Sequence, residues 1–236
     1  MKVLFDHSVR QHALRGEHGY VYFAPYRPGY NNLIEPAHNI RPARTDWLQD
    51  EIDCLGKIAE LCRRKKLLPY ITEELESEEF RALKFPSPNH DDLFEGIQFK
   101  KAQCPIVRSK WGLSAKQYTD KNDVIAYCKC FFLTPSKERT EKFIAGMKEN
   151  PRFSLSEFEE RCLRNSDVFR NICRGISENH YPDALHLWTA EENGLDVFLT
   201  MDKKFKNVMA RQKIGLHCRV MLPSDVLRAL ESIGSC

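Results

Sequence analysis

Short apolar segments alternate along the chain with segments of helical periodicity. Residues 3–5, 67–71, 197–200 and 219–222 are short runs rich in β-branched and other apolar side chains, which are typical of buried strands. Residues that commonly cap the start or the end of a helix lie between these runs. Strand and helix in this order predict an α/β fold of three layers, with a mainly parallel central sheet flanked by helices.

The helical segments have recognisable starts and ends. From Thr45 onward apolar residues recur at steps of three and four, with Thr45 as the expected N-cap. Thr72 can cap a helix after the second strand. Pro182 suits the first turn of a helix that ends at Asn193 and Gly194, and Pro223 suits the first turn of a C-terminal helix.

The length of 236 residues is most simply a single domain over 1–236. Two segments interrupt the alternation: an irregular, Tyr- and Pro-rich excursion at about 17–44, and a mostly helical insertion at about 85–177. Helices are expected within the insertion near 121–132, 137–148 and 156–176. Ser156 and Glu159 form the pattern of a capping box at the start of the last one.

Composition indicates a soluble, intracellular and cytoplasmic protein. The N-terminus lacks the pattern of a signal peptide, and no apolar run reaches about 18 residues, so no membrane association is expected. The nine cysteines are odd in number and scattered, as reduced thiols are. The close pair Cys128 and Cys130 is interpreted as core packing, with a zinc site as the alternative.

Two long stretches contain basic residues and no acid. The first, within 96–119, also contains aromatic residues, and the second follows Asp202. Such stretches suit a phosphate backbone, although a solvated surface that balances acids elsewhere is the alternative interpretation. The residues predicted to bind nucleic acid are Lys100, Lys101, Arg108, Lys110, Trp111, Lys203 and Lys204.

Acidic residues fall where parallel strands end and the next helices begin. Asp6 and Asp202 follow strands, and Asp183 lies in the first turn of a helix. Glu74 and Glu78 lie in the first two turns after the second strand. These positions share one edge of a parallel sheet, and carboxylates crowded there would repel unless a divalent cation such as Mg²⁺ or Mn²⁺ lies between them.

A cation at that edge would suit phosphodiester hydrolysis, because it activates water and neutralises the phosphate. Each acid also has a structural alternative. Asp183 could stabilise a helix dipole, Asp6 and Asp202 could form turns, and the glutamates could lie on a solvated helix face. The chemistry therefore predicts a metal-dependent phosphodiesterase but does not select its nucleic acid.

In four segments the chain resembles the PIN domain, a family of metal-dependent nucleases. "VLFDHSV" resembles the opening strand that ends in Asp, and "YITEELESEE" resembles the strand, cap and helix that supply a second acid. "DALHLWTAEENGLDVFLTMDKKF" resembles the helix, strand and Thr-x-Asp turn, and "VMLPSDVLRAL" the closing strand and helix. The resemblance covers roughly half of the chain and is interrupted by the excursion and the insertion.

This resemblance implies an endoribonuclease that uses Mg²⁺ or Mn²⁺. The implied metal-binding and catalytic cluster is Asp6, Glu78, Asp183 and Asp202, with Glu74 as the alternative to Glu78 and with Ser8 and Thr200 in support. DNA is left open as an alternative substrate, and so is a PIN-like module that binds nucleic acid or a partner without cutting. A homodimer and an inhibitory protein partner are also implied as alternatives. A nucleotide-binding α/β domain is disfavoured, because no glycine-rich phosphate loop follows the first two strands.

Overall fold

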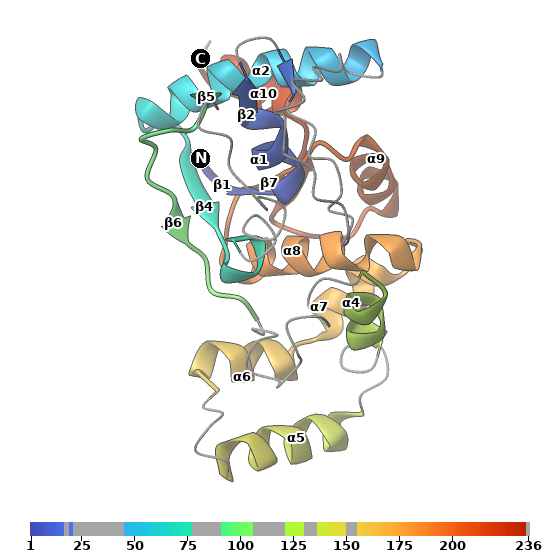
Figure 1. Ribbon diagram of the computed structural model, residues 1–236. Helices are drawn as coiled ribbons and strands as arrows, with labels where there is room; N and C mark the ends of the chain where they lie inside the picture. The colour runs from blue at the N-terminus through green and yellow to red at the C-terminus, as the bar shows by residue number, and fades with distance from the viewer. Residues whose placement is uncertain are drawn as a thin grey trace, which may run out of the picture.

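The computed structural model of the protein describes residues 1–16, 19–20, 45–76, 91–105, 121–129, 136–149 and 155–234. At its centre is a five-stranded sheet in the order β6-β4-β1-β7-β8, and every neighbouring pair of strands is parallel (Figure 1). The strands are β1 (Lys2–Phe5), β4 (Leu68–Ile71), β6 (Lys100–Lys101), β7 (Val197–Leu199) and β8 (Arg219–Met221). The predicted α/β class with a parallel sheet is therefore confirmed.

The order of the strands changes direction at the centre of the sheet. From β1 the chain moves outward to β4 and β6, and then returns to β7 on the other side of β1 before reaching β8. In open parallel sheets such a reversal leaves a crevice at the carboxyl ends of the two central strands, which is where ligands usually bind. The carboxyl ends of β1 and β7 are thus the first place to look for a site.

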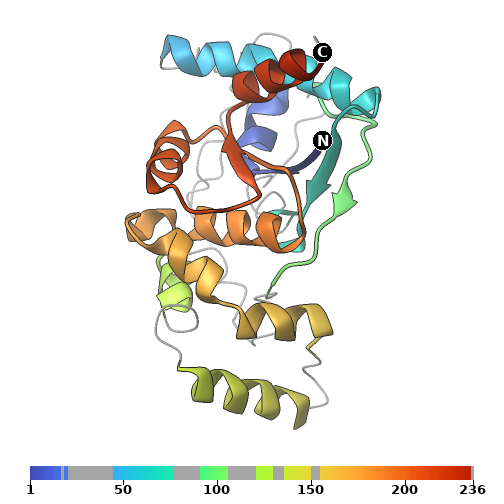
Figure 2. The same ribbon diagram turned by 180° about the vertical axis from the view of Figure 1, so that it is seen from behind.

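Two helical layers cover the sheet because alternate strand residues point to opposite faces. Val3 and Phe5 pack in one hydrophobic cluster with residues of α2 (Asp46–Arg63) and α10 (Pro223–Gly234). Leu4, which lies between them, packs in another cluster with residues of α8 (Tyr181–Glu192). Figures 1 and 2 show α2 and α10 on one side of the sheet and α8 on the other. The expected three-layer arrangement is present.

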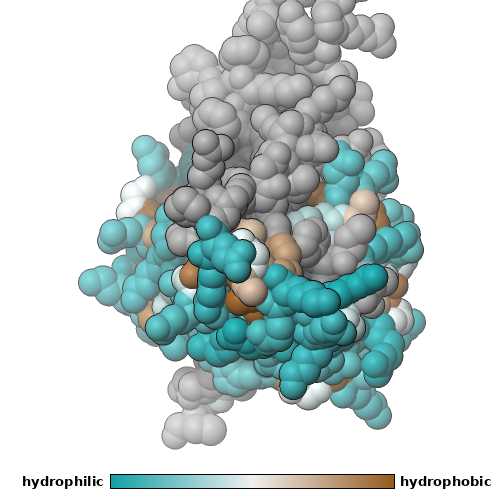
Figure 3. Space-filling view, turned by 90° about the horizontal axis from the view of Figure 1, so that it is seen from below, coloured by the Kyte–Doolittle hydropathy of each residue, from teal (hydrophilic) through white to brown (hydrophobic). Residues whose placement is uncertain are grey.

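Further helices extend the α8 side of the molecule. Both α4 (Lys121–Cys128) and α7 (Asp167–Cys173) pack against α8. The outermost pair is α6 (Glu157–Arg164) and α5 (Lys137–Glu149), where Arg164 Nε lies 3.0 Å from Glu141 Oε1. Lys148 Nζ lies 2.9 Å from Glu160 Oε1 across the same pair of helices. Seen from this end, the coloured surface is mostly hydrophilic (Figure 3).

The remaining described elements are short or lie close to the carboxyl edge. A small antiparallel sheet is formed by β3 (Gly19–Tyr20), β2 (Leu14–Gly16) and β5 (Asp91–Asp92). The helix α1 (His7–Ala13) follows β1 directly, the 3-10 turn η3 (Glu178–His180) precedes α8, and α9 (Lys203–Gln212) follows β7. In this way α1, α8 and α9 all begin within a few residues of the predicted acids.

Several local predictions are confirmed by hydrogen bonds. The Leu75 N–H donates to Thr72 Oγ1 at 3.1 Å, and Ser156 with Glu159 forms a complete capping box. Thr45 does occupy the N-cap position of α2, but its side chain makes no cap hydrogen bond. Most of the 17–44 excursion and parts of the 85–177 insertion lie outside the described residues.

The helical stretch predicted near 156–176 is present, but it is divided into two helices, α6 and α7. They are separated by a turn at Asn165 and Ser166. Ser166 is the N-cap of α7 without a side-chain cap hydrogen bond, and its Oγ accepts from Arg170 Nη1 at 3.0 Å. The helical spacing of apolar residues continues across the break, so this spacing alone did not predict the break between α6 and α7.

Two general expectations bear on the environment of the protein. Among the described helices, none has the length and apolar character needed to cross a bilayer. Seven cysteines in the described ranges are free, and all but Cys54 are buried. Burial raises the pKa of the Cys62 and Cys162 thiols to about 12, so these two side chains act as core residues.

Candidate functional site

Asp6 is held in a fixed orientation at the carboxyl end of β1. Its side chain is buried, and Oδ2 accepts hydrogen bonds from Ser8 Oγ and from Thr200 Oγ1, the latter at 2.8 Å. Oδ1 accepts from the His7 N–H at 2.8 Å. Since Leu4 faces α8, Asp6 two residues later is placed toward the same side of the sheet.

Thr200 and Asp202 form the turn that leads from β7 into α9. Thr200 Oγ1 accepts from the Asp202 N–H at 3.0 Å, and Asp202 Oδ1 accepts from the Phe205 N–H at 2.9 Å. Asp202 is therefore the N-cap of α9, and its position is fixed by the local backbone. Oδ1 is used by the cap, whereas Oδ2 faces the start of α8.

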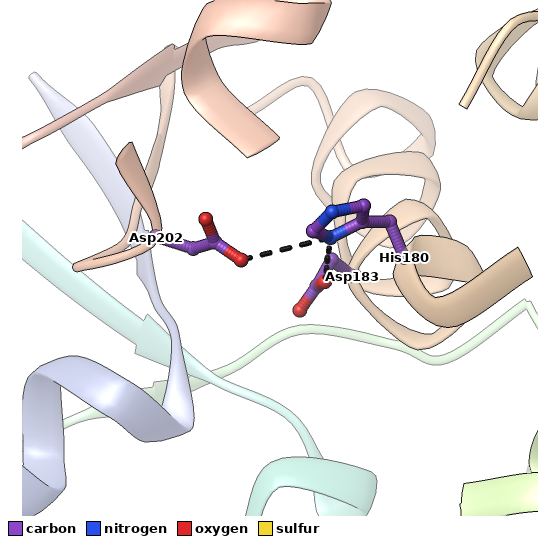
Figure 4. Close-up of side chains that lie close together, drawn as sticks. All are labelled: His180, Asp183 and Asp202. Carbon is purple, nitrogen blue, oxygen red and sulfur yellow. Dashed lines mark hydrogen bonds and ion pairs between the residues drawn. The ribbon is translucent and has the colours of Figure 1, made fainter. Parts of the chain in front are cut away.

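Two residues at the start of α8 complete the group. Asp183 lies in the first turn of α8, and His180 is both the last residue of η3 and the N-cap residue of α8. His180 Nδ1 lies 3.1 Å from Asp183 Oδ2 and 3.6 Å from Asp202 Oδ2 (Figure 4). The imidazole ring also lies beside the buried Phe205 ring, with 5.7 Å between centroids. His180 is thus packed between the two carboxylates and an aromatic side chain.

One ligand atom from each of His180, Asp183 and Asp202 lies within 4.8 Å of the other two. Two ligands bonded to one cation at about 2.1 Å are about 3.0 to 3.4 Å apart at octahedral or tetrahedral angles. The 3.1 and 3.6 Å separations from His180 Nδ1 are close to these values. An imidazole and two carboxylates are also common metal ligands, so the donor set fits a divalent cation.

Electrostatics shows that the three Asp side chains interact. Burial, followed by the charge of Asp6, raises the pKa of the Asp183 carboxyl to about 6, and the hydrogen bond with His180 acts against this rise. The Asp202 charge also raises the pKa of Asp183. Repulsion among carboxylates is what a bound cation would relieve, because an opposite charge favours their ionised form.

The structure brings together most of the residues that were predicted to form the site. Asp6, Asp183, Asp202, Ser8 and Thr200 all lie at the carboxyl ends of β1 and β7 or at the start of α8, with the contacts given above. Among the described residues, the group that could hold a metal consists of His180, Asp183 and Asp202, and does not include Asp6. Asp6 instead holds Thr200 and acts on Asp183 through its charge.

The second acid of the prediction is not located by the structure. Glu78 lies outside the described residues, so its role stays a prediction. Glu74, the alternative, is buried in the first turn after β4, at the same edge of the sheet as Asp6. It is not a member of the described group of metal-ligating side chains.

The predicted nucleic-acid-binding residues fall into two groups. Lys203 and Lys204 are exposed in the first turn of α9, directly after Asp202. Lys100 and Lys101 are exposed on β6 at the edge of the sheet, where Lys101 forms an ion pair with Glu76. The other three, Arg108, Lys110 and Trp111, lie outside the described residues.

Two residues near the site were not predicted, His180 and Trp47. The signal for His180 was its position three residues before Asp183, which puts both side chains on one face of the chain as it enters a helix. Trp47 lies in the first turn of α2, and Lys203 Nζ lies 5.0 Å from the centre of its ring. No sequence pattern joins Trp47 to Lys203, because only the packing of α2 near α9 brings them together.

Comparisons with known proteins give no relative from which a function could be transferred: no family model matches the chain, and neither a curated protein nor a solved structure matches it.

Proposed function

We propose that the protein is a metal-dependent nuclease of the PIN type that hydrolyses RNA phosphodiester bonds. The observation that supports this most is the group of His180, Asp183 and Asp202 at the point where the strand order reverses. Carboxylates from the start of α8 and from the turn after β7 meet there, and the pKa of Asp183 is raised by burial and then by the charge of Asp6. Such perturbed groups in a ligand-binding crevice are typical of functional sites.

The residues of the chain would have separate tasks. Asp183 Oδ2, Asp202 Oδ2 and His180 Nδ1 would hold the cation, while Asp6 would add negative charge and keep Thr200 in place. When bound, a divalent cation would lower the pKa of a water and neutralise charge on the phosphate. Ser8 Oγ donates to the Asp6 carboxylate and accepts from the Met201 N–H at 3.1 Å, which joins the turn before Asp202 to Asp6.

The substrate would be bound beside this group by positive and aromatic side chains. Lys203 and Lys204 follow Asp202 directly, and the Trp47 ring lies against Lys203. A cation and an aromatic face together suit the phosphates and bases of a single strand. The choice of RNA rests on the resemblance to PIN domains, so the test includes DNA.

Purified protein would be incubated with end-labelled RNA and DNA, each single- and double-stranded, in Mn²⁺, in Mg²⁺ or in EDTA. We expect cleavage of single-stranded RNA that requires a divalent cation and leaves a 5′-phosphate. Cleavage of DNA alone would show that the substrate is DNA and not RNA, while the proposed metal-dependent hydrolysis would stand. Binding of nucleic acid without cleavage in either metal would favour a non-cutting module, and cleavage that persists in EDTA would exclude the proposed mechanism.

A further inference from the structure

The feature that the predicted acidic cluster does not account for is the imidazole of His180. A site made of carboxylates and water alone binds its cation through oxygen, as Mg²⁺ prefers. In this protein, however, Nδ1 of His180 is the atom that lies close to both Asp183 and Asp202. Among described residues, these three form the metal-ligating group.

We infer that His180 Nδ1 is a direct metal ligand and that the site therefore selects a first-row transition ion, such as Mn²⁺, over Mg²⁺. This inference rests on the proposed function, because it concerns the same site. Imidazole nitrogen is a common ligand of transition ions, whereas Mg²⁺ takes oxygen ligands almost exclusively. A nitrogen among the three protein ligands therefore favours the transition ion.

The position of His180 is restricted by its own backbone and packing contacts. The residue ends the 3-10 turn η3, where its N–H donates to the Ser177 carbonyl at 2.9 Å. The ring lies beside Phe205, which is fully buried and is itself fixed by the N-cap bond to Asp202. The histidine ring is joined to the backbone by a single Cβ atom. The backbone hydrogen bond and the aromatic contact together therefore restrict where Nδ1 can lie.

The exposure of the group agrees with a site that an ion can enter from solvent. The side chains of His180, Asp183 and Asp202 are 20%, 26% and 33% exposed. A His–Asp pair that only stabilised the start of α8 would need one carboxylate, and the second carboxylate would add nothing to it. Placement of Nδ1 between two acids from different segments is the arrangement that a shared cation needs.

The chain provides a matched control in another His–Asp pair. His217 Nε2 lies 3.4 Å from Asp196 Oδ1, and Asp196 precedes β7, at the opposite end of that strand from Asp202. This pair is not part of the described group that could hold a metal, and it lies at the amino edge of the sheet. His217→Gln should therefore leave metal binding unchanged.

The test is Mn²⁺ binding followed by electron paramagnetic resonance, with Mg²⁺ as competitor and no nucleic acid present. Pulsed spectra of the Mn²⁺ complex should show coupling to a nitrogen nucleus in the wild-type protein and in His217→Gln, and no such coupling in His180→Gln. We expect wild-type protein to bind Mn²⁺ about tenfold or more tightly than Mg²⁺, and His180→Gln to lose most of that preference. His180→Asp, which supplies an oxygen instead, should bind Mg²⁺ better than His180→Gln does.

The possible failures are distinguishable. Saturable Mn²⁺ binding that is lost in Asp202→Asn but shows no nitrogen coupling in the wild-type protein would overturn the inference about His180 and leave the proposed metal site intact. Absence of saturable binding of either ion would overturn both. The nitrogen coupling is read from the wild-type spectrum, so a folding defect in His180→Gln would not hide this result. Asp202→Asn, which locates the bound Mn²⁺, is first checked for folding by thermal unfolding.

Discussion

Thr200 Oγ1 donates a hydrogen bond of 2.8 Å to Asp6 Oδ2, joining two residues that are 194 positions apart in the chain. The bond connects the carboxyl end of β1 to that of β7, the two strands between which the sheet order reverses. The same hydroxyl accepts from the Asp202 N–H. One threonine thus sets the relative positions of two predicted catalytic acids.

The variant Thr200→Val tests this positioning, since valine keeps the shape of threonine and removes the hydroxyl. The buried Asp6 carboxylate and the Asp202 N–H each lose a partner, so we expect a loss of about 1 to 3 kcal/mol in the free energy of unfolding. We also expect Mn²⁺ affinity to fall by about tenfold, as is usual when the support of a metal ligand is removed. Denaturant unfolding and calorimetry measure the two effects. Thr140→Val on α5, where the hydroxyl donates to the Ser136 carbonyl, is the control and should leave metal affinity unchanged.

The pH dependence of stability tests the raised pKa of Asp183. The pKa of Asp183 is raised from 3.8 to about 6 in the folded protein, first by burial and then by the Asp6 charge. Between these values the folded state holds one more proton than the unfolded state, so without metal the free energy of unfolding falls as pH rises from about 4 to about 6. Asp183→Asn cannot titrate. The difference in free energy of unfolding between Asp183→Asn and the wild type should therefore shift in favour of the variant by about 2 to 3 kcal/mol between pH 4 and pH 7.5.

The opposite sign is expected at Asp196, which makes it a useful comparison. Burial acts to raise the pKa of this carboxyl, but the hydrogen bond from the Lys2 N–H and the neighbouring His217 outweigh burial, and the net pKa is lowered. The ionised form is therefore favoured by folding. Asp196→Asn should cost more stability at pH 7.5 than at pH 3, where the wild-type group is also losing its charge. Equal pH profiles for the Asp183 and Asp196 variants, measured in EDTA, would show that folding does not raise the pKa of Asp183.

The double variant Lys203→Ala, Lys204→Ala tests the substrate path. Both lysines are exposed next to Asp202, so their loss should weaken binding to all nucleic-acid sequences about equally. The log–log salt slope should become shallower by up to about one unit for each lost phosphate contact. The measurement is fluorescence anisotropy at several salt concentrations in EDTA.

A neighbouring lysine pair provides the control for that experiment. Lys65 and Lys66 are also consecutive and exposed, but they lie between α2 and β4, at the amino edge of the sheet. Their replacement by alanine removes the same charge without touching the candidate site. If both double variants bind with the same affinity and salt slope, the lysines after Asp202 belong to a solvated surface and the substrate binds elsewhere.

The sheet and three of its acids could be predicted because topology determines them. Asp6, Asp183 and Asp202 lie at strand ends and a helix start, and any open parallel sheet brings these positions to one edge. The strand β6 could not be predicted, because Lys100 and Lys101 have no apolar pattern and form a strand through pairing with β4 at the edge. Charged residues are common at such edges.

The contacts that complete the site depend on packing rather than on pattern. His180 faces Asp202 only because η3 and α8 start beside the turn that follows β7, and the sequence separation of the two residues gives no hint of this. Trp47 meets Lys203 for a similar reason. The helix α1 was also missed, since His7–Ala13 is a short segment whose buried residues are Val9 and Ala13.

The central claim is that a cation held by the cluster at the carboxyl edge cleaves phosphodiester bonds, and Asp202→Asn tests it most directly. Asparagine keeps the size of the side chain and remains a good N-cap for α9, so the fold should be retained, which thermal unfolding would verify. The variant removes one ligand charge from the group with His180 and Asp183. We would measure single-turnover cleavage of end-labelled single-stranded RNA in Mn²⁺ by wild-type and variant proteins purified in parallel. The account predicts metal-dependent cleavage by the wild type and a rate about 100-fold or more lower for the variant, since a metal-bound site contributes several kcal/mol to such a reaction. Equal rates for a folded Asp202→Asn and the wild type would contradict it.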